Sequence, residues 1–321
     1  MKKIYFNFPF SGGVRQFSEK LQEKCSIYDD VEFYYLEAGW LKRLALFKFI
    51  FEREIWFSNN NVLIYFFLLL YPYKCNLILH DHKIRKGASK KEYLLIYLFR
   101  LFRWRFKNVI IHQKNDEDSQ CLLNKRNVKY HYMPPHGYEV DVKLKIFEQR
   151  KASQKINLLC FGRVEEYKNF NYIADLVSEL DNVELIIAGR GMSSERLEEY
   201  SHRENIKVID GYIEDGDVPS LFENSDYLVL PYTSITQTTL IDLAGAYSKP
   251  VILSNIDSFK VYQELRHVLI LDINSRLKSL ELLKSLNEVN PEEYEIMSKS
   301  SHAFYLQSLK KWESYVEIIR T

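Results

Sequence analysis

Cysteine and long apolar runs are both scarce in this chain of 321 residues. The four cysteines are Cys25, Cys75, Cys121 and Cys160. Their scattered positions show no paired spacing, which argues against a disulfide framework and against a zinc site. The longest apolar run, residues 62–73, contains Pro72 and falls short of the roughly 20 residues that a membrane-spanning helix needs. The start of the chain also lacks the apolar segment of a signal peptide, so we expect a cytoplasmic protein with reduced thiols.

An overall excess of one charge sign is missing too, because the net charge is only +1. The two halves nevertheless differ. Residues 1–150 hold 26 Lys/Arg and 16 Asp/Glu, which gives a net charge of +10. Residues 151–321 hold 18 Lys/Arg and 27 Asp/Glu, which gives a net charge of −9. This difference indicates two domains with different partners. Nucleic acid binding is not expected, because the whole chain is not basic and its aromatic residues form no recognition motif.

The second half alternates short apolar strands with helical patterns. Strands are predicted at 156–162, 183–189, 206–210, 226–232 and 250–255, and helices at 169–180, 193–203, 218–225 and 236–248. Parallel strands need crossover connections, and helices between strands supply them. The pattern predicts a Rossmann-like domain over residues 151–321.

The first half is less regular but of the same type. A strand is predicted at 2–8, a glycine turn with a helix at 11–24, and further strands at 31–37, 61–67, 75–81 and 108–113. The two prolines and the glycine of residues 129–140 predict a hinge, and the helical segment 291–321 is expected to pack back on the first domain. We therefore predict an α/β protein with two Rossmann-like domains, 1–150 and 151–321, that face each other across a cleft.

The stretch FGRVEEYKNF, residues 161–170, places two cations in the loop between a strand and its helix. An arginine guanidinium can bind two phosphate oxygens at once, and a lysine ammonium adds a compact positive charge. The N-terminus of the following helix also favours anions. Arg163 and Lys168 could therefore hold a diphosphate. The alternative is a solvated surface pair whose partners are Glu165 and Glu166.

The same stretch resembles the G-R-x4-K motif of the family 4 glycosyltransferases. The resemblance continues in order through LIIAGRG (185–191), residues 208–232 and residues 234–252. In the first half, FSGGVRQF, LILHDH and MPPHGY resemble that family's glycine loop, histidine loop and interdomain strand end. The resemblance implies the GT-B fold and retaining transfer of a sugar from a UDP- or GDP-linked donor, with no metal and no further cofactor.

The resemblance also implies roles for particular residues. Arg163 and Lys168 would bind the donor phosphates and stabilise the leaving diphosphate. The backbone near Tyr212 and Ile213 would contact the base. The remaining donor contacts would come from Gln237, from the amides of Thr238 and Thr239, and from the backbone at Gly12 and Gly13. His80 would lie against the donor sugar and the reaction centre.

The chain departs from the family pattern before its K-P-V run. Many members carry two glutamates eight residues apart, and here those positions hold Ile235 and Leu243. A subset of the family instead has a glutamine followed by small residues, as in TQTT (236–239). Asp242, next to the second position, is then the residue expected to reach the donor ribose.

Two acidic or histidine-rich motifs raise the question of a metal. His80 and His82 project to the same side of a strand, but no further ligands follow at metal-site spacing. Asp215 and Asp217 resemble a D-x-D motif, yet they precede a helix where aspartate is a common N-cap. We expect no metal site at either place.

Residues 91–107 form the most amphipathic stretch outside the predicted cleft. Arg100, Arg103 and Lys107 would share one helical face among Leu, Phe and Trp residues, and residues 41–53 are similar. Such helices suit the headgroup layer of an anionic membrane, whereas ordinary helices that cover the sheet are the alternative.

Together these patterns predict a retaining glycosyltransferase that extends a glycan or a lipid-linked glycan in polysaccharide biosynthesis. It would be cytoplasmic and peripheral on the inner face of the membrane. Two alternatives remain: a nucleotide-sugar epimerase of the same fold, and a non-catalytic partner in a glycosyltransferase complex.

Overall fold

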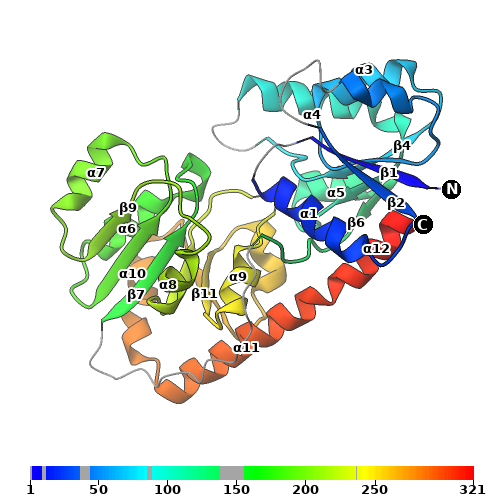
Figure 1. Cartoon of the computed structure of the whole chain (residues 1–321). Helices are drawn as coiled ribbons and strands as arrows, with labels where there is room; N and C mark the ends of the chain where they lie inside the picture. The colour runs from blue at the N-terminus through cyan, green and yellow to red at the C-terminus, as the bar shows by residue number, and fades with distance from the viewer. Residues whose placement is uncertain (1, 9–11, 37–43, 85–88, 138–154, 236) are drawn as a thin grey trace. The chain divides into compact units, whose positions relative to one another are not determined.

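The computed structural model describes residues 2–8, 12–36, 44–84, 89–137, 155–235 and 237–321. The chain divides into two compact units (Figure 1). Unit 1 comprises Met1–Gly137 and Ser308–Thr321, and unit 2 comprises Tyr138–Gln307. The predicted domain boundary at residue 150 and the end of the predicted hinge, residues 138–140, lie outside the described residues.

Unit 1 is built on a parallel sheet of six strands in the order β2-β1-β3-β4-β5-β6. The strands are β1 (Lys3–Asn7), β2 (Val31–Tyr35), β3 (Ile55–Phe57), β4 (Cys75–Leu79), β5 (Phe106–Ile111) and β6 (Val128–Tyr130). The helices are α1 (Gly13–Cys25), α3 (Val62–Leu70), α4 (Lys90–Phe102), α5 (Glu117–Leu123) and α12 (Lys311–Arg320), with 3-10 turns η1 (Leu44–Phe49) and η2 (Arg103–Arg105). The order is that of a doubly wound fold in which the direction of strand succession reverses between β1 and β3.

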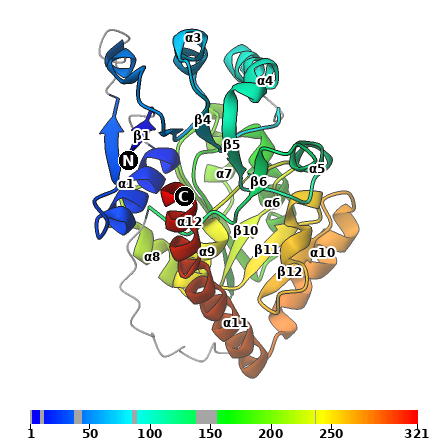
Figure 2. The ribbon, with the colours of Figure 1, turned by 90° about the vertical axis from the view of Figure 1, so that its right-hand side faces the viewer.

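Alternate residues of these strands are buried on opposite faces of the sheet, as the two-residue period of a strand requires. Phe6 and Leu77 pack with α3 and α4, whereas Tyr5 and Ile78 pack with α1 and α12. Figure 2 shows the two pairs of helices on opposite sides of the sheet. Both faces are covered, which explains why β3 and β4, inside the sheet, are buried along their whole length.

The last helix, α12, belongs to unit 1 although it ends the sequence. Trp312 stacks on Phe17 of α1 with ring centroids 5.3 Å apart, and its indole N–H donates to the carbonyl of Pro135 at 3.0 Å. Near the end of the helix, the Arg320 guanidinium donates to Asp30 at 2.8 Å. Segments distant in sequence are thus joined in one core.

The predicted strand at 61–67 is wrong, because these residues form helix α3. Asn61 caps the helix by accepting a hydrogen bond from the Leu63 amide at 3.0 Å. A short, continuous apolar run fits a buried strand and a helix equally well by periodicity. The strand actually present, β3, has only three residues and was not predicted.

The helix predicted at 91–107 is shorter than expected. Helix α4 begins after a capping box between Ser89 and Glu92 and ends at Phe102, and η2 follows. Lys107 lies in β5, where it pairs with Glu54 at 2.8 Å, so it shares no helical face with Arg100. In the other predicted amphipathic stretch, residues 41–43 lie outside the described residues and 44–49 form the 3-10 turn η1.

Unit 2 contains a second parallel six-stranded sheet, in the order β12-β11-β10-β7-β8-β9. The strands are β7 (Ile156–Phe161), β8 (Val183–Ala188), β9 (Ile206–Ile209), β10 (Tyr227–Leu230), β11 (Val251–Ser254) and β12 (Val268–Leu271). The helices are α6 (Phe170–Val177), α7 (Ser194–Ser201), α8 (Val218–Glu223), α9 (Leu240–Ala246), α10 (Arg276–Ser285) and α11 (Pro291–Leu309), with 3-10 turns η3 (Glu166–Lys168), η4 (Asp257–Tyr262) and η5 (Leu286–Glu288). Both units are Rossmann-like, so this part of the prediction is confirmed.

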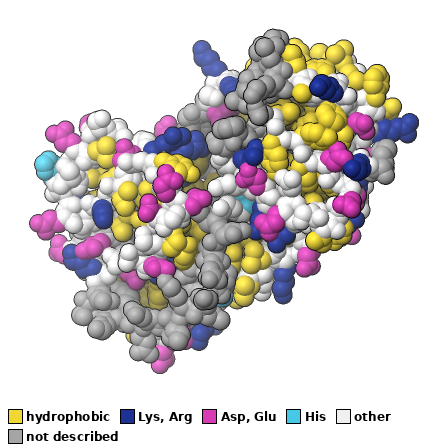
Figure 3. All heavy atoms as spheres, in the orientation of Figure 1, with side chains coloured by type: hydrophobic (Ala, Val, Ile, Leu, Met, Phe, Trp, Pro, Cys, Tyr) yellow, Lys and Arg dark blue, Asp and Glu magenta, His cyan; other side chains and the backbone are white. Residues whose placement is uncertain are grey.

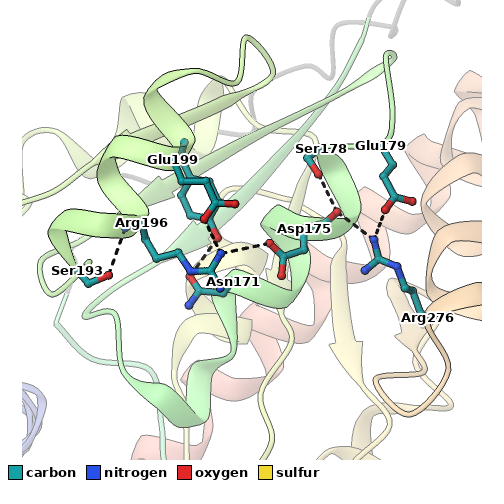
Figure 4. Close-up of polar contacts among 9 residues, drawn as sticks. Asn171, Asp175, Ser178, Glu179, Ser193, Arg196, Glu199 and Arg276 are labelled. Carbon is teal, nitrogen blue, oxygen red and sulfur yellow. Dashed lines mark hydrogen bonds and ion pairs between the residues drawn. The ribbon is translucent and has the colours of Figure 1, made fainter.

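Polar contacts tie three helices of unit 2 together on its surface (Figure 4). Arg196 of α7 lies 3.7 Å from the Asp175 carboxylate of α6, and Arg276 of α10 donates to the Asp175 carbonyl at 3.3 Å. These contacts are exposed, so each one stabilises the unit only weakly. The apolar core beneath supplies most of the stability.

None of the helices in the described part of the chain is long and apolar enough to cross a membrane.

Candidate active site

The strand order of unit 2 defines where a ligand would bind. Strand β7 lies between β8 and β10, and the direction of strand succession reverses between β7 and β10. In open α/β sheets, ligands bind at the carboxyl ends of the strands beside such a reversal. The loop after β7 carries Arg163 and Lys168, and the loop after β10 leads to Gln237.

Hydrogen bonds join these two loops. The amide and the hydroxyl of Thr233, after β10, both donate to the carbonyl of Tyr167, after β7, at 2.8 and 3.3 Å. Tyr167 lies in η3, directly before Lys168. The position of Lys168 therefore depends on both strands that flank the reversal.

Lys168 is a nearly buried cation, with only 9% of its surface exposed. Its ammonium lies 5.5 Å from the ring centroid of Phe170 and 5.8 Å from that of Tyr232, within cation–π range. Gly162 lies beside this ammonium at a φ of +99°, which disfavours a side chain, and a Cβ there would lie 2.7 Å from the ammonium and displace it. A positive charge held in such a poorly solvated place interacts strongly with an anion that reaches it.

Two further glycines allow the loops after β7 and β8 to approach closely. The Gly162 amide donates to the Ala188 carbonyl at 2.8 Å, and a Cβ at Gly189 would lie 2.4 Å from the Gly162 carbonyl oxygen. At Gly191, a Cβ would lie 2.8 Å from the Val164 carbonyl oxygen. Both glycines also have positive φ angles, 144° and 116°. The AGRG stretch is therefore a packing feature of this strand edge.

Arg163 differs from Lys168 in its surroundings. Its side chain is 64% exposed and pairs with Glu165 at 3.0 Å. An exposed pair of this kind contributes little to stability and can exchange partners at small cost. The surface pair considered from the sequence is therefore present at Arg163, whereas Lys168 is enclosed by the protein.

The predicted base contacts follow β9. Tyr212 is 69% exposed, and Ile213 is half-buried against the core. Asp210, two residues before Tyr212, accepts hydrogen bonds from the amides of Gly191 and Met192 at 3.0 and 3.4 Å. An exposed aromatic ring beside the loop after β8 is available to a ligand at this edge.

The residues predicted to bind the donor around the start of α9 differ in solvent exposure. Gln237, Thr238 and Thr239 are half-buried, and the Thr238 hydroxyl accepts from the Leu240 amide at 3.2 Å. Asp242 has no solvent-exposed surface. Its predicted contact with the donor ribose remains a prediction, and this conformation does not present the carboxylate to solvent.

In unit 1, Gly12 precedes helix α1 with a φ of +88°, and Gly13 is its first residue. No described atom lies within 4 Å of a Cβ built at either glycine. The backbone conformation at Gly12 therefore favours glycine, and the space around both glycines is open.

His80 follows β4 as predicted, but it is only 1% exposed. Its ring lies 5.1 Å from that of His112 and 5.4 Å from that of Phe17, and the His136 ring lies 5.2 Å from Phe17. We call His80, His112 and His136 the histidine cluster. Sequence reasoning missed two of its members, although His112 follows a strand directly, as His80 does.

Burial keeps two members of the histidine cluster, His112 and His136, uncharged near neutral pH. It lowers the pKa of His136 to about 4, and with the nearby His80 it holds the pKa of His112 well below its usual range. His112 Nδ1 lies 3.1 Å from the His131 carbonyl oxygen and donates a hydrogen bond to it. Neutral imidazoles at this edge can accept or donate a proton in a hydrogen bond without carrying charge.

His82 points to a different set of partners. Its Nε2 lies 2.8 Å from the Ser119 hydroxyl, which donates to Asp116 at 2.9 Å. Lys83 lies 3.5 Å from the same carboxylate. His82 therefore anchors the loop after β4 to helix α5 and does not join His80 at a common centre.

Among the described residues, no group of three or more His, Cys, Asp and Glu side chains is arranged to hold a metal ion. Asp217 occupies the predicted N-cap position of α8, but its side chain makes no capping hydrogen bond.

A comparison with protein families matches residues 155–275 to the family model "Glycosyl transferases group 1". The matched segment lies inside unit 2 and contains the loops around Lys168. Part of unit 2 therefore matches a glycosyltransferase group 1 domain, and this match supports the predicted transferase activity.

Similar proteins have also been found by sequence and by structure. An uncharacterized 41.2 kDa protein in the cps region of Klebsiella pneumoniae is 24% identical over 54% of this chain. The matched part spans about half (55%) of that relative's length. Anabaena Alr3699/HepE, solved with UDP, covers 99% of both chains at a TM-score of 0.73 and 14% identity. WaaG, a glycosyltransferase involved in lipopolysaccharide biosynthesis, matches with a TM-score of 0.66 and 13% identity. The match covers 98% of this chain and 99% of the WaaG chain. At such identities the structural likeness shows the fold alone, which is the predicted GT-B fold.

Proposed function

We propose that this chain is a retaining glycosyltransferase that moves a sugar from a UDP- or GDP-linked donor to a glycan or lipid-linked acceptor. We place it in the family 4 subset that lacks the paired glutamates. The observation that carries the proposal is Lys168, a nearly buried cation at the strand reversal of a glycosyltransferase group 1 domain. HepE, which shares the fold, has been solved with UDP and with UDP-glucose.

In the proposed reaction, the bond between C1 of the donor sugar and the diphosphate oxygen breaks. The acceptor hydroxyl oxygen bonds to C1 on the same face, and its proton passes to an oxygen of the departing diphosphate. Negative charge grows on the diphosphate as the bond breaks, so Lys168 and Arg163 stabilise the transition state more than the ground state. The amides of Thr238 and Thr239 add hydrogen bonds to the same group.

The other predicted contacts complete the donor site. Tyr212 and Ile213 contact the base, and Gln237 contributes a polar side chain near the diphosphate. For unit 1, the roles of Gly12 and Gly13 at the diphosphate and of His80 at the donor sugar stay predictions from the sequence. The proposed reaction needs no metal ion, because Arg163 and Lys168 balance the negative charge of the diphosphate.

The acceptor is proposed to belong to polysaccharide biosynthesis. The Klebsiella relative is encoded in a cps region, and WaaG is described as acting in lipopolysaccharide biosynthesis. Both likenesses are distant, so the acceptor assignment depends mainly on the surface of unit 1.

That surface is apolar and basic over α3 and α4. Its exposed apolar residues are Phe66, Leu69, Leu70, Tyr93, Leu94, Tyr97, Leu101 and Trp104, and Lys90, Lys91 and Arg100 are exposed among them. We call these residues the α3–α4 surface, and Figure 3 shows hydrophobic side chains gathered there. Interleaved cations and large apolar side chains suit an anionic bilayer, so we propose that this surface holds the protein on the membrane. Binding to lipid vesicles measures this directly.

Calorimetric titration with UDP and GDP tests the donor site. We expect one of the nucleotides to bind, and Lys168→Met to weaken binding by about ten- to a hundredfold, because a hydrogen bond to a charged group is lost. Arg163→Gln should weaken it about tenfold without changing thermal stability.

Lys207→Met is the matched control, because Lys207 is an exposed lysine of the same unit, in β9. The proposal fails if neither nucleotide binds, or if Lys168→Met binds like the control. Isomerised donor sugar, formed without acceptor, would instead identify an epimerase.

A further inference from the structure

Glu165 is an acidic residue in the loop that carries both cations of the proposed donor site. It follows Arg163 by two residues and precedes Lys168 by three. Its carboxylate lies 3.0 Å from the Arg163 guanidinium. A negative charge at the carboxyl end of β7 opposes the binding of an anion there, because like charges repel. Stability alone does not explain this residue, since an exposed ion pair contributes little.

The backbone on both sides of the Glu165 side chain is fixed by hydrogen bonds. The Val164 amide donates to the Arg190 carbonyl, in the loop after β8, at 2.9 Å. The Glu165 carbonyl accepts from the Lys168 amide at 2.9 Å and so closes the 3-10 turn η3. Glu165 is thus held in the same turn as Lys168, and its side chain starts from a defined place.

The carboxylate of Glu165 plays no part in capping this turn. The residue occupies the N-cap position of η3 but makes no capping hydrogen bond with its side chain. Its charge acts on the enclosed part of the site instead. Burial raises the pKa of the Tyr232 hydroxyl well above its usual range, and the charge of Glu165 is among the further causes. Since the Tyr232 ring also faces the Lys168 ammonium, the carboxylate belongs to the surroundings of both cations.

The two partners of the ion pair differ in exposure. The Arg163 side chain is 64% exposed, whereas that of Glu165 is 28% exposed. The longer arginine can therefore turn from the carboxylate towards a bound ligand, while the shorter glutamate stays against the loop. Exchange of one anionic partner for another costs little for a group that is partly in water. A phosphate group also offers a guanidinium the same bidentate contact as a carboxylate does.

We propose that Glu165 is the counter-ion that holds Arg163 while the donor site is empty, and that it competes with the donor diphosphate for this arginine. The inference rests on the proposed function, because it needs a diphosphate at the carboxyl end of β7. Glu165 thereby sets the affinity of the site, since the diphosphate gains the guanidinium only by displacing the carboxylate. When the diphosphate product leaves, Glu165 takes Arg163 back, so release leaves no unpaired cation.

Glu165→Gln is the informative variant, because it keeps the size of the side chain and removes the charge. The probes are UDP and GDP, titrated calorimetrically into the full chain. We expect the nucleotide that binds the wild type to bind Glu165→Gln about fivefold more tightly, because a competing ion pair is lost. A misfolded variant would bind more weakly, so tighter binding is not explained by damage to the fold.

Glu184→Gln is the matched control. Glu184 also forms an ion pair at 3.0 Å, with Lys155, and its side chain is 43% exposed. It lies near the start of β8, whereas the proposed donor site lies at the carboxyl ends of the strands. The two variants therefore lose the same charge and the same kind of ion pair at opposite ends of one sheet. Equal tightening by both would show that net charge alone acts, and would overturn the inference.

A double-mutant cycle with Arg163→Gln tests whether the effect of Glu165 passes through Arg163. In the Arg163→Gln background, we expect Glu165→Gln to change the Kd by less than about twofold, because there is no guanidinium to release. Full tightening in both backgrounds would show that Glu165 only repels the nucleotide, and the proposed exchange would be wrong.

The same titrations separate this inference from the proposed function. Suppose that UDP or GDP binds the wild type and Lys168→Met weakens the binding, while Glu165→Gln binds like the wild type. The counter-ion role is then wrong, and the proposed function stands. If the wild type binds neither nucleotide, the proposed function falls, and the role of Glu165 with it.

Discussion

The two units have the same kind of sheet but line its carboxyl edge with different residues. In unit 2, Gly162, Gly189 and Gly191 follow the strands with positive φ angles, and their loops lie against each other. In unit 1, His80 and His112 follow β4 and β5 directly, and their rings are buried. One edge is thus made of closely packed backbone, and the other of side chains.

This difference shows how one architecture can suit two kinds of ligand. Close backbone packing leaves amides and a single enclosed lysine at the edge of unit 2, which suits a diphosphate. The buried, neutral imidazoles of His112 and His136 in unit 1 suit a ligand recognised through hydroxyl groups.

The largest effect on stability is expected where two backbone segments of unit 2 lie closest together. Gly189→Ala should destabilise the unit by about 4 kcal/mol, because the new Cβ would lie 2.4 Å from the Gly162 carbonyl oxygen at a φ of 144°. Urea denaturation followed by circular dichroism measures the change. Gly216→Ala, where no described atom lies within 4 Å of the Cβ, should stay within about 0.5 kcal/mol. Equal stability of the two variants would contradict the role of close packing.

Acid should destabilise unit 1 more than unit 2. Burial lowers the pKa of His82, His112, His131 and His136 in unit 1, and of His267 in unit 2. The unfolded chain binds protons below about pH 6.5, whereas folded His136 binds one only near its pKa of about 4. Stability is therefore complete above about pH 6.5 and falls as the pH drops towards 4. His136 alone should cost about 2–3 kcal/mol.

Urea midpoints at about pH 7 and about pH 5 measure this loss, read by the fluorescence of the four tryptophans, which all lie in unit 1. His136→Gln should reduce the difference between the two pH values. His202→Gln should not, because His202 is exposed. A unit 1 midpoint that does not change between the two pH values would show that the cluster does not resist protonation.

The smallest effect is expected at the α3–α4 surface. Leu101→Asp should weaken binding to phosphatidylglycerol vesicles about tenfold, because an inserted apolar side chain is replaced by a charge of the wrong sign. Sedimentation with these vesicles, and with phosphatidylcholine vesicles for comparison, measures it. The matched control is Leu277→Asp, at a leucine of α10 in unit 2 that is 68% exposed. If both variants bind like the wild type, membrane contact does not pass through this surface.

The strands and helices of unit 2 could be predicted well, and those of unit 1 less well. In unit 2, short apolar runs are separated by clear helical patterns, so 183–189 and 226–232 proved to be strands. In unit 1, the run at 61–67 is apolar all round, and a helix packed on a sheet looks the same as a buried strand. Three-residue β3 is too short to give a periodic signal at all.

The sequence by itself determined the two-domain fold class and the cations of the loop after β7, because hydrophobic period and local motif are properties of neighbouring residues. Only the tertiary structure decided that Lys168 is enclosed while Arg163 is exposed. It also brought His80 to His112, since these residues follow different strands. Parallel pairing sets their carboxyl ends at one edge, and that register depends on the whole sheet and not on any one segment.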